Sequence, residues 1–345
     1  MSKGKHFVVP MVCVAAVHLV TFLSGFFAPY DYSEQDRHLP YAPPSTLHFR
    51  DAQGTWHWRP SVCALVERPE QFGVYEEDRT RCFPLAFFTR GYRYSAFWLI
   101  QSDRHLLAVT PPAKIFLLGS DGYGRDELSR LLYGGRLSLC AGLLAAASSV
   151  GLGLLLGTVA GYYGGWCDAI VMRCVELFLA LPWLYLLFAL RAFLPLHVSP
   201  SQAFLLLIAV LGIVGWARPA RLIRGIVLSE KERTYVLAAR MFGGSDFYLM
   251  HQHIAPRTYG LLLTQAALLV PQYILAEVTL SFLGLGVAEP VPSWGNMLAA
   301  LQQYDVLVSY WWIWAPGFAL FLVCINYWRL ASAMQVAAEG TAHWQ

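Results

Sequence analysis

The 345-residue chain contains 57% hydrophobic and 14% charged residues, and its mean hydropathy is +0.45. Soluble domains carry roughly 25% charged residues, so this composition excludes an ordinary soluble protein and predicts a polytopic protein of the lipid bilayer. The formal net charge of +3 is too small to indicate a nucleic-acid partner.

Six segments are apolar and long enough to cross a hydrocarbon core about 30 Å thick, which takes roughly 20 helical residues. The first follows Lys3 and Lys5 and ends without a small-residue cleavage site, so we interpret it as an uncleaved anchor. Pro182 and Pro316 are expected to kink their helices. The predicted spans are 7–28, 137–160, 167–191, 202–222, 261–284 and 311–333.

The loop between the fourth and fifth spans fixes the predicted orientation. It carries Arg218, Arg221, Arg224, Lys231, Arg233, Arg240 and Arg257 close to the membrane. Cytoplasmic loops are enriched in such residues, so this loop is predicted to be cytoplasmic. Counting spans then places both termini in the cytoplasm and residues 30–135 outside.

Residues 30–112 are polar, aromatic and interrupted by prolines, which predicts an extracytoplasmic insertion with some β structure. Cys63 and Cys82 are its only cysteines and lie in a compartment that permits disulfides. Two alternatives stay open, a Cys63–Cys82 bridge and two free thiols. Histidines 38, 48, 57 and 105 are interpreted as scattered surface residues and not as a nickel site.

The segment "LLGSDGYGRDELSRLLYGGRLSL" at 117–139 contains closely spaced glycines and charges. It does not match a dinucleotide motif because Glu127 stands where the third glycine belongs, and the chain has no P-loop motif. A cation site at Asp121, Asp126 and Glu127 is one interpretation. We favour another, in which Asp121 or Asp126 caps the following helix and the glycines, Gly122 among them, shape a turn.

The helix that begins there is predicted to lie in the outer membrane interface, within a segment at 113–136. Its leucines fall largely on one face, which suits the apolar side of such a helix. The polar residues fall mostly elsewhere and are Arg125, Ser129, Arg130 and Arg136. The chain has no hydrolase motif or paired C-x-x-C, so neither catalytic residues nor a metal site are predicted.

The cytoplasmic segment "YVLAARMFGGSDFYLMHQHIAP" indicates a helix, a glycine break at Gly243 and a second helix. Ser245 or Asp246 is expected to cap that second helix, which is expected to end before Pro256. From these residues alone, the segment is either an ordinary amphipathic loop or a rigid element on which a partner docks. A β-carbon at position 243 is expected to obstruct the turn.

This loop resembles the EAA loop in the membrane subunits of ABC importers. The matching residues are Ala238, Ala239, Gly243, Ile254 and Pro256, with Leu237 in place of the usual glutamate and Ala255 in place of leucine. Together with 117–139 and "EVTLSFLGLGVAEPVPSWGNML", it resembles the C-type permease of the dipeptide/oligopeptide/nickel importer family over residues 7–28 and 113–335. The outer insertion, longer than in most relatives, is similar to that of the Yej-type peptide permease.

The resemblance implies an all-α polytopic membrane protein with six helices of the type I ABC importer permease fold, in the bacterial inner membrane. It implies a homologous B-type permease, two cytoplasmic ATP-binding subunits that hold ATP and Mg, and an extracytoplasmic solute-binding protein as partners. No cofactor is expected on this chain. The residues expected to couple to the ATPases are Leu237, Ala238, Ala239, Gly243, Ser245, Asp246, Ile254 and Pro256.

The predicted organisation is a first span at 7–28, the insertion at 30–112, the turn and helix at 113–136 and a permease core at 137–335 with a coupling loop at 223–258. Glu277 either faces the translocation path or has a structural role, because buried ionisable groups are costly. Trp294 belongs either to an interfacial aromatic belt or to an outer gate. The path or gate candidates are Glu277, Ser281, Trp294, Gly122, Arg125 and Asp126.

The alternative function is an ion-coupled secondary transporter of small solutes, which needs intramembrane carboxylates. Only Glu277 offers one at mid-span. The substrate is not encoded in any motif, so peptides, nickel and glutathione-like solutes remain open.

Overall fold

A computed structural model describes residues 3–50, 55–68, 73–96, 100–110, 113–193 and 199–342. The chain forms two compact units, each described here by itself. The helical unit comprises Met1–Val14, Cys140–Leu280 and Val323–Gln345, and the sheet unit comprises Ala15–Leu139 and Ser281–Leu322.

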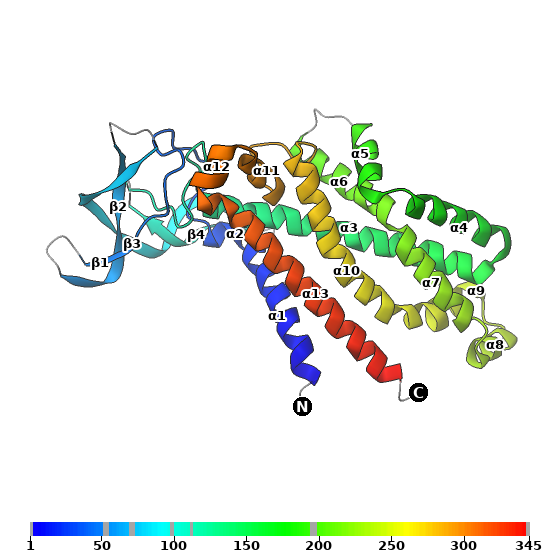
Figure 1. The fold of residues 1–345 in the computed structure, drawn as a ribbon. Helices are drawn as coiled ribbons and strands as arrows, with labels where there is room; N and C mark the ends of the chain where they lie inside the picture. Colours follow the sequence, from blue (N-terminus) through cyan, green and yellow to red (C-terminus); the bar gives the residue numbers. More distant parts are fainter. Residues whose placement is uncertain are drawn as a thin grey trace. The chain divides into compact units, whose positions relative to one another are not determined.

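Helices make up most of the described chain, as Figure 1 shows. They are α1 (Lys3–Phe22), α2 (Ser24–Phe27), α3 (Glu127–Tyr163), α4 (Gly165–Ala180), α5 (Trp183–Ala192), α6 (Pro200–Gly215), α7 (Ala217–Glu230), α8 (Thr234–Met241), α9 (Asp246–Tyr248), α10 (Ala255–Phe282), α11 (Trp294–Leu298), α12 (Tyr304–Ser309) and α13 (Ala315–Ala342).

Three helical stretches of the described residues are long and apolar enough to cross a membrane, namely Glu127–Tyr163, Asp246–Phe282 and Trp311–Val336. Two bent pairs raise the number to five if each pair forms one span. They are Gly165–Ala180 with Trp183–Ala189, bent by 95°, and Pro200–Gly215 with Ala217–Glu230, bent by 43°. The segment predicted as the first span forms a shorter apolar helix, Phe7–Phe22.

The two prolines expected to kink helices behave differently. Pro182 lies at the sharp bend between α4 and α5, where the kink is confirmed. For Pro316 the prediction was wrong, because this residue lies in the first turn of α13. Backbone N–H groups have no partner within the helix at that position, so a proline costs little there.

Close glycine packing joins α3 to α7 in the helical unit. Gly153, Gly157 and Gly161 repeat every fourth residue along α3. A β-carbon on Gly157 would lie 2.5 Å from the Ala220 carbonyl oxygen, and one on Gly161 would lie 2.8 Å from the Val227 Cβ. Small residues at this spacing let two helix backbones approach closely.

The sheet unit contains one antiparallel sheet in the order β1-β2-β3-β4, which confirms β structure in the insertion. The strands are β1 (His48–Arg50), β2 (Trp56–Glu67), β3 (Tyr75–Ala96) and β4 (Ile100–Val109). The long strand β3 pairs with β2 through its first part and with β4 through its second part. Cys63 and Cys82 lie opposite each other on β2 and β3 and are joined by a disulfide.

One histidine of the insertion does not lie on the surface, contrary to prediction. His105 on β4 is only 1% exposed. Its Nδ1 lies 3.1 Å from the Ala28 carbonyl oxygen and its Nε2 lies 2.9 Å from that of Tyr92. Each ring nitrogen therefore faces a backbone carbonyl oxygen, which accepts a hydrogen bond from whichever nitrogen carries a proton.

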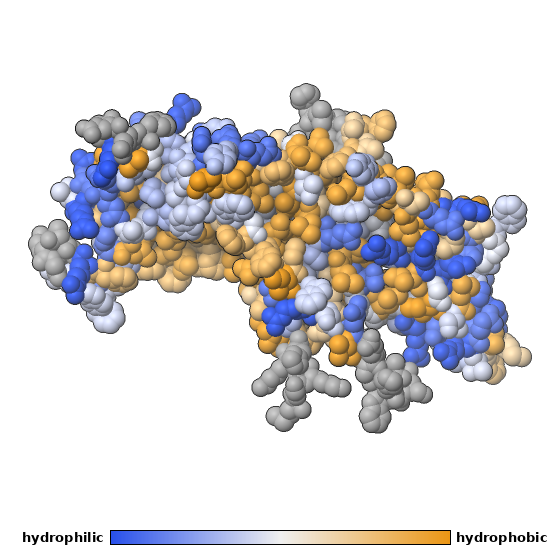
Figure 2. Space-filling view, viewed as in Figure 1, coloured by the Kyte–Doolittle hydropathy of each residue, from blue (hydrophilic) through white to orange (hydrophobic). Residues whose placement is uncertain are grey.

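Surface hydropathy distinguishes regions within the helical unit. Figure 2 shows hydrophobic residues over much of its helices and hydrophilic residues gathered around the end that carries α8 and α9. Apolar helix surfaces suit contact with lipid, and polar ends suit contact with water.

Candidate functional site

The loop between α7 and α10 has the predicted helix, glycine break and helix. α8 ends at Met241, and Gly243 follows with a φ of 84°. The Ser245 hydroxyl then accepts a hydrogen bond from the Tyr248 backbone N–H and caps the second helix. Of the two capping residues expected, the structure therefore has Ser245.

The second helix does not end before Pro256, which corrects the prediction. A π-helical turn, Leu249–Ile254, connects α9 directly to α10, and the Ala255 backbone N–H donates to the Met250 carbonyl. This wider turn, with bonds to the fifth preceding residue, accommodates a residue that lacks an N–H. Pro256 consequently lies in the first turn of a 28-residue helix.

Glycine at position 243 is required by the backbone conformation of the turn. A β-carbon there would meet nothing within 4 Å, so nothing described obstructs it. The requirement comes from the positive φ, which disfavours residues with a β-carbon. At Gly244, by contrast, a β-carbon would lie 2.8 Å from the Ala239 carbonyl oxygen, so steric crowding applies to that neighbour.

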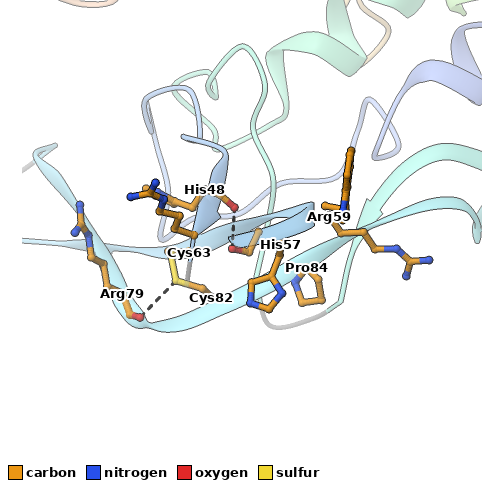
Figure 3. Close-up of a pocket in the computed structure, with 10 residues that line it drawn as sticks. His48, His57, Arg59, Cys63, Arg79, Cys82 and Pro84 are labelled. Carbon is orange, nitrogen blue, oxygen red and sulfur yellow. Dashed lines mark hydrogen bonds between the residues drawn. A yellow bond between two sulfur atoms is a disulfide. The ribbon is translucent and has the colours of Figure 1, made fainter. Parts of the chain in front are cut away.

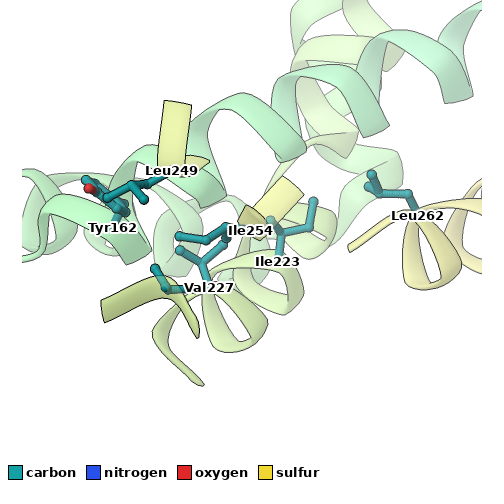
Figure 4. Packing of buried hydrophobic residues seen from close by; sticks show 7 residues of the cluster. Tyr162, Ile223, Val227, Leu249, Ile254 and Leu262 are labelled. Atoms are coloured by element: carbon teal, nitrogen blue, oxygen red, sulfur yellow. The ribbon is translucent and has the colours of Figure 1, made fainter. Parts of the chain in front are cut away.

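The inner side of the loop is anchored in the helical unit. Val236, Leu249 and Ile254 are fully buried and pack in one cluster. Figure 4 shows this packing of the loop against residues of α3, α7 and α10. The other members of the cluster are Tyr162, Ile223, Val227 and Leu262.

Hydrogen bonds near the end of α3 also hold the loop in place. The Tyr162 hydroxyl donates a 2.6 Å hydrogen bond to the Asp246 carboxylate and accepts one of 2.9 Å from the Arg240 guanidinium. The Lys231 ammonium donates to the Gly161 carbonyl, 3.1 Å away. Sequence patterns did not single out Tyr162, because its partners lie 78 or more residues away.

The outer side of the loop is apolar and exposed. The exposed fractions of Met241, Phe242 and Phe247 are 89%, 93% and 73%. Leu237, where the resemblance to the EAA loop implies glutamate, is 39% exposed. Large apolar side chains gathered around a rigid turn indicate a surface that contacts another protein.

A second candidate region lies in the sheet unit, where Asp121, Arg125, Arg130 and Glu289 form what we call the charge network. Arg125 donates from Nε to Asp121 and from Nη1 to Glu289, at 2.7 Å each. Arg130 donates from Nη2 to Glu289 at 2.8 Å. Burial opposes ionisation of Glu289, but the two guanidinium charges hold its pKa below the ordinary value.

The helix that begins at Glu127 does not present its polar residues to water, contrary to prediction. Arg125, Ser129, Arg130 and Arg136 are between 0% and 9% exposed. The charge network explains the burial of the two arginines it contains, because paired guanidinium groups can be removed from water. The predicted interfacial helix and second span form the single helix α3.

Asp126 caps α3, as one of the two favoured residues. Its Oδ2 accepts hydrogen bonds from the Ser129 backbone N–H at 2.8 Å and from the Ser129 hydroxyl at 2.6 Å. Burial raises the pKa of Asp126 to about 7, although the bonds from Ser129 act in the opposite direction. Asp121 instead accepts from backbone N–H groups within the preceding turn.

The charge network borders a cavity of about 440 Å³ whose lining includes Gly122, Arg125 and Glu289. A β-carbon on Gly122 would lie 2.7 Å from the Tyr41 hydroxyl oxygen, so the absence of a side chain at Gly122 lets the Tyr41 ring pack directly against its backbone. Trp294 is only 2% exposed, and its Nε1 donates to the Leu131 carbonyl at 3.0 Å. This tryptophan therefore does not belong to a lipid-facing aromatic belt.

Comparison with known proteins identifies the family. Residues 153–333, just over half of the chain, match the model of the binding-protein-dependent transport system inner membrane component. The chain belongs to this family of ABC transporter permeases. The permease is a multi-pass inner-membrane component and not itself an enzyme.

Its relatives include permeases that are named for the peptides they transport. The permease is 36% identical to the dipeptide transport system permease protein DppC of Bacillus subtilis (strain 168) over 230 residues, 66% of this chain and 70% of that protein. It is 37% identical to the probable D,D-dipeptide transport system permease protein DdpC of Escherichia coli (strain K12), over 67% of this chain and 76% of that one. It is 34% identical to the oligopeptide transport system permease protein OppC of Haemophilus influenzae (strain ATCC 51907 / DSM 11121 / KW20 / Rd), over 71% of this chain and 78% of that one.

The remaining path candidates of this permease lie inside its units. Glu277 on α10 is 0% exposed, and Ser281 is 3% exposed. A β-carbon on Gly286 would lie 1.9 Å from the Ser281 hydroxyl oxygen, so Ser281 packs against backbone. For Glu277, complete burial favours the structural role over direct contact with a solute.

Proposed function

We propose that this permease is the C-type subunit of an ABC importer that carries short peptides across the inner membrane. The observation that carries the proposal is the loop at 234–256, which combines a buried, hydrogen-bonded base with the exposed side chains Met241, Phe242 and Phe247. The peptide substrate is proposed from the relatives, which are named as dipeptide and oligopeptide permeases.

In this proposal the chain has six spans, both termini are cytoplasmic and the sheet lies outside. The short helix Phe7–Phe22 and the two bent pairs supply the three spans beyond the long helices. The loop at 234–256 lies in the cytoplasm and seats on one of two ATPase subunits. A homologous B-type permease and an extracytoplasmic binding protein complete the importer, and ATP and Mg bind to the ATPases.

The packing of the loop at 234–256 against α3 and α7 couples motion of the ATPases to motion of the membrane helices. Closure of the ATPases around ATP displaces the exposed side of the loop. The buried side transmits that displacement to α3 and α7, so the permease shifts between inward and outward access as a rigid body. Gly243→Asp places a charge on the docking surface, at a position whose φ an aspartate tolerates better than most residues. We expect the variant to assemble but to lose ATPase stimulation by substrate.

The test is reconstitution of the permease with its B-type partner, ATPases and binding protein in lipid vesicles. Uptake of a labelled dipeptide is expected to require ATP. Uptake driven by an ion gradient without ATP would instead support the secondary transporter.

A matched pair of variants tests the docking surface. Phe242→Ser is expected to reduce the amount of ATPase that copurifies by tenfold or more, since buried aromatic anchors dominate interfaces and are worth roughly 2 kcal/mol or more. Phe193→Ser is the control, because Phe193 is 88% exposed but lies near the opposite end of the proposed third span. Equal copurification of both variants would contradict docking through this loop.

A further inference from the structure

Two other metal-binding side chains lie beside the disulfide of the sheet. The ligand atoms of His48, Cys63 and Glu77 all lie within 4.8 Å of one another. They converge because β1, β2 and β3 are neighbours, with Ser61 opposite His48 and Leu65 opposite Glu77. Figure 3 shows His48 close to the bridged Cys63 and Cys82 at the cavity wall.

We propose that this cluster is a zinc site controlled by thiol–disulfide exchange: reduction of the bridge frees Cys63 and Cys82 to bind one Zn²⁺ together with His48 and Glu77. Two thiolates, an imidazole and a carboxylate make up a four-coordinate set of the kind that zinc prefers. The inference goes beyond the proposed transport function and does not depend on it.

The distances require a small movement of three ligand atoms and a larger one of the Cys82 sulfur. Zinc binds sulfur at about 2.3 Å and nitrogen or oxygen at about 2.0–2.2 Å, so its tetrahedral ligand atoms lie roughly 3.3–3.8 Å apart. The Cys63 sulfur, at most 4.8 Å from the other two atoms, must therefore approach them by up to about 1 Å. His48 Nε2 and the Glu77 oxygen, now 2.7 Å apart, must move apart by roughly 0.6 Å to make room for the ion. The Cys82 sulfur is not among the atoms that lie within 4.8 Å of one another, so it must move furthest as it leaves the Cys63 sulfur. The strand has room for this, because Cys63 pairs with Cys82 while Ala64 pairs with Asp78, which leaves residues 79–81 outside the ladder.

Charge favours the metal only in the reduced state. Zn²⁺ with two thiolates, one carboxylate and a neutral imidazole carries a net charge of −1. The cavity of about 810 Å³ beside the cluster is also lined by Arg50, Arg59 and Arg79, which offset that charge. In the bridged state the thiolates are absent, so the same arginines repel a divalent cation. The cavity gives the ion a route from solvent.

Neighbouring hydrogen bonds already orient two of the ligands. His48 Nε2 lies 2.7 Å from a Glu77 carboxylate oxygen, and the Thr46 hydroxyl contacts both side chains. When zinc replaces the His48–Glu77 contact, the Thr46 hydroxyl can still donate to the second carboxylate oxygen. Outer contacts of this kind hold metal ligands in place and commonly contribute tenfold or more to affinity.

The exchange balances as follows. A dithiol reductant gives two electrons and two protons to the bridge, so the Cys63–Cys82 S–S bond breaks, two thiols form and the reductant becomes a disulfide. Zinc binding then releases one proton from each thiol to solvent. His48 binds through Nε2 and keeps its proton on Nδ1, and Glu77 binds as the carboxylate.

The experiment titrates Co²⁺ into the full chain in lipid nanodiscs with its partner permease. The protein carries Ser at the five other cysteines, which are Cys13, Cys140, Cys167, Cys174 and Cys324. After reduction with dithiothreitol and desalting without oxygen, we expect thiolate-to-cobalt absorption that saturates at one ion per chain and disappears when Zn²⁺ is added. The oxidised protein is expected to show none. Equal absorption in both states, or none after reduction, would overturn the proposal.

Variants identify the ligands. His48→Ala is expected to weaken zinc binding by at least about tenfold. His57→Ala is the matched control, because His57 lines the same cavity but is outside the ligand set. An equal loss in both variants would contradict the assigned site.

Alkylation of the reduced wild-type protein decides the question without a variant. Zn²⁺ is expected to protect Cys63 and Cys82 from N-ethylmaleimide, as read by peptide mass spectrometry. A chelator is expected to restore their labelling. Unprotected cysteines would overturn the proposal.

Discussion

The Tyr162 hydroxyl donates a 2.6 Å hydrogen bond to the Asp246 carboxylate, which ties the last turn of α3 to the first turn of α9. The two residues are 84 positions apart in the chain. This contact fixes the start of the second loop helix relative to the transmembrane helix beneath it.

Tyr162→Phe removes this bond and is expected to destabilise the loop by about 1 kcal/mol, as a partly buried hydrogen bond to a charged group does. Substrate-stimulated ATPase activity is expected to fall, because the apolar cluster alone then holds the loop against α3 and the start of α9 is less firmly fixed. Tyr163→Phe is the matched control, since Tyr163 is 56% exposed. A double-mutant cycle with Asp246→Asn measures the coupling, and a coupling energy near zero would rule out the contact.

The two loop glycines are expected to respond differently to substitution. At Gly243 the restriction is its φ of 84°, so Gly243→Asn is expected to be tolerated better than Gly243→Ala, which costs roughly 1–2 kcal/mol. At Gly244 the close Ala239 carbonyl rejects any β-carbon, so asparagine should be no better than alanine. Melting temperatures of the four variants test this pattern. The explanation fails if Gly243→Asn is as damaging as Gly243→Ala.

Glu289→Gln is expected to destabilise the sheet unit by about 1–3 kcal/mol, because it leaves two buried guanidinium groups without their shared carboxylate. The value lies below that of a fully buried pair, since the Glu289 side chain is 47% exposed. Glu176→Gln is the control. In its ion pair with Arg173 both side chains are exposed to solvent, and such a pair is worth about 0–1 kcal/mol. Thermal unfolding compares the two, and similar shifts would contradict a stabilising network.

Asp126 predicts an unusual dependence of stability on pH. Its pKa rises from 3.8 to about 7 on folding, so between these values the folded state binds more protons than the unfolded state. This group's contribution to stability therefore decreases as pH rises from about 4 to 7 and is constant above. Asp126→Asn keeps an oxygen for the Ser129 N–H and removes the titration. Its melting temperature should decline less over that interval, and an unchanged profile would exclude Asp126 as the source.

Local signals predicted the loop well. The cap at Ser245 and the break at Gly243 depend on neighbouring residues, which a sequence displays directly. Pro256 was misjudged because the π-helical turn before it depends on backbone geometry that residue types do not specify. The turn was expected to require glycine at position 243, and the structure attributes this to a φ of 84°, since a β-carbon there would meet nothing within 4 Å.

Long-range contacts were beyond sequence patterns. In the sequence, Arg125 and Arg130 look like residues on the solvent-exposed face of an interfacial helix. Only the structure shows that Glu289, more than 150 residues later, pairs with both of them. Burial of Trp294 likewise depends on the distant backbone of Leu131. Helical periodicity describes which residues share a face and does not reveal what covers that face.

The glycine repeat of α3 has a mechanical consequence. At Gly157 the nearest atom of α7 is the Ala220 carbonyl oxygen, and at Gly161 the nearest atoms are those of the Val227 side chain, so at most one small, branched side chain separates the two backbones at these points. Such a joint is stiff, since closely packed backbones cannot slide without collision. The loop, α7 and this half of α3 are therefore expected to move together as one rigid body. In the proposed importer, a force applied at Phe242 would therefore be transmitted to α3 as displacement, with little local deformation.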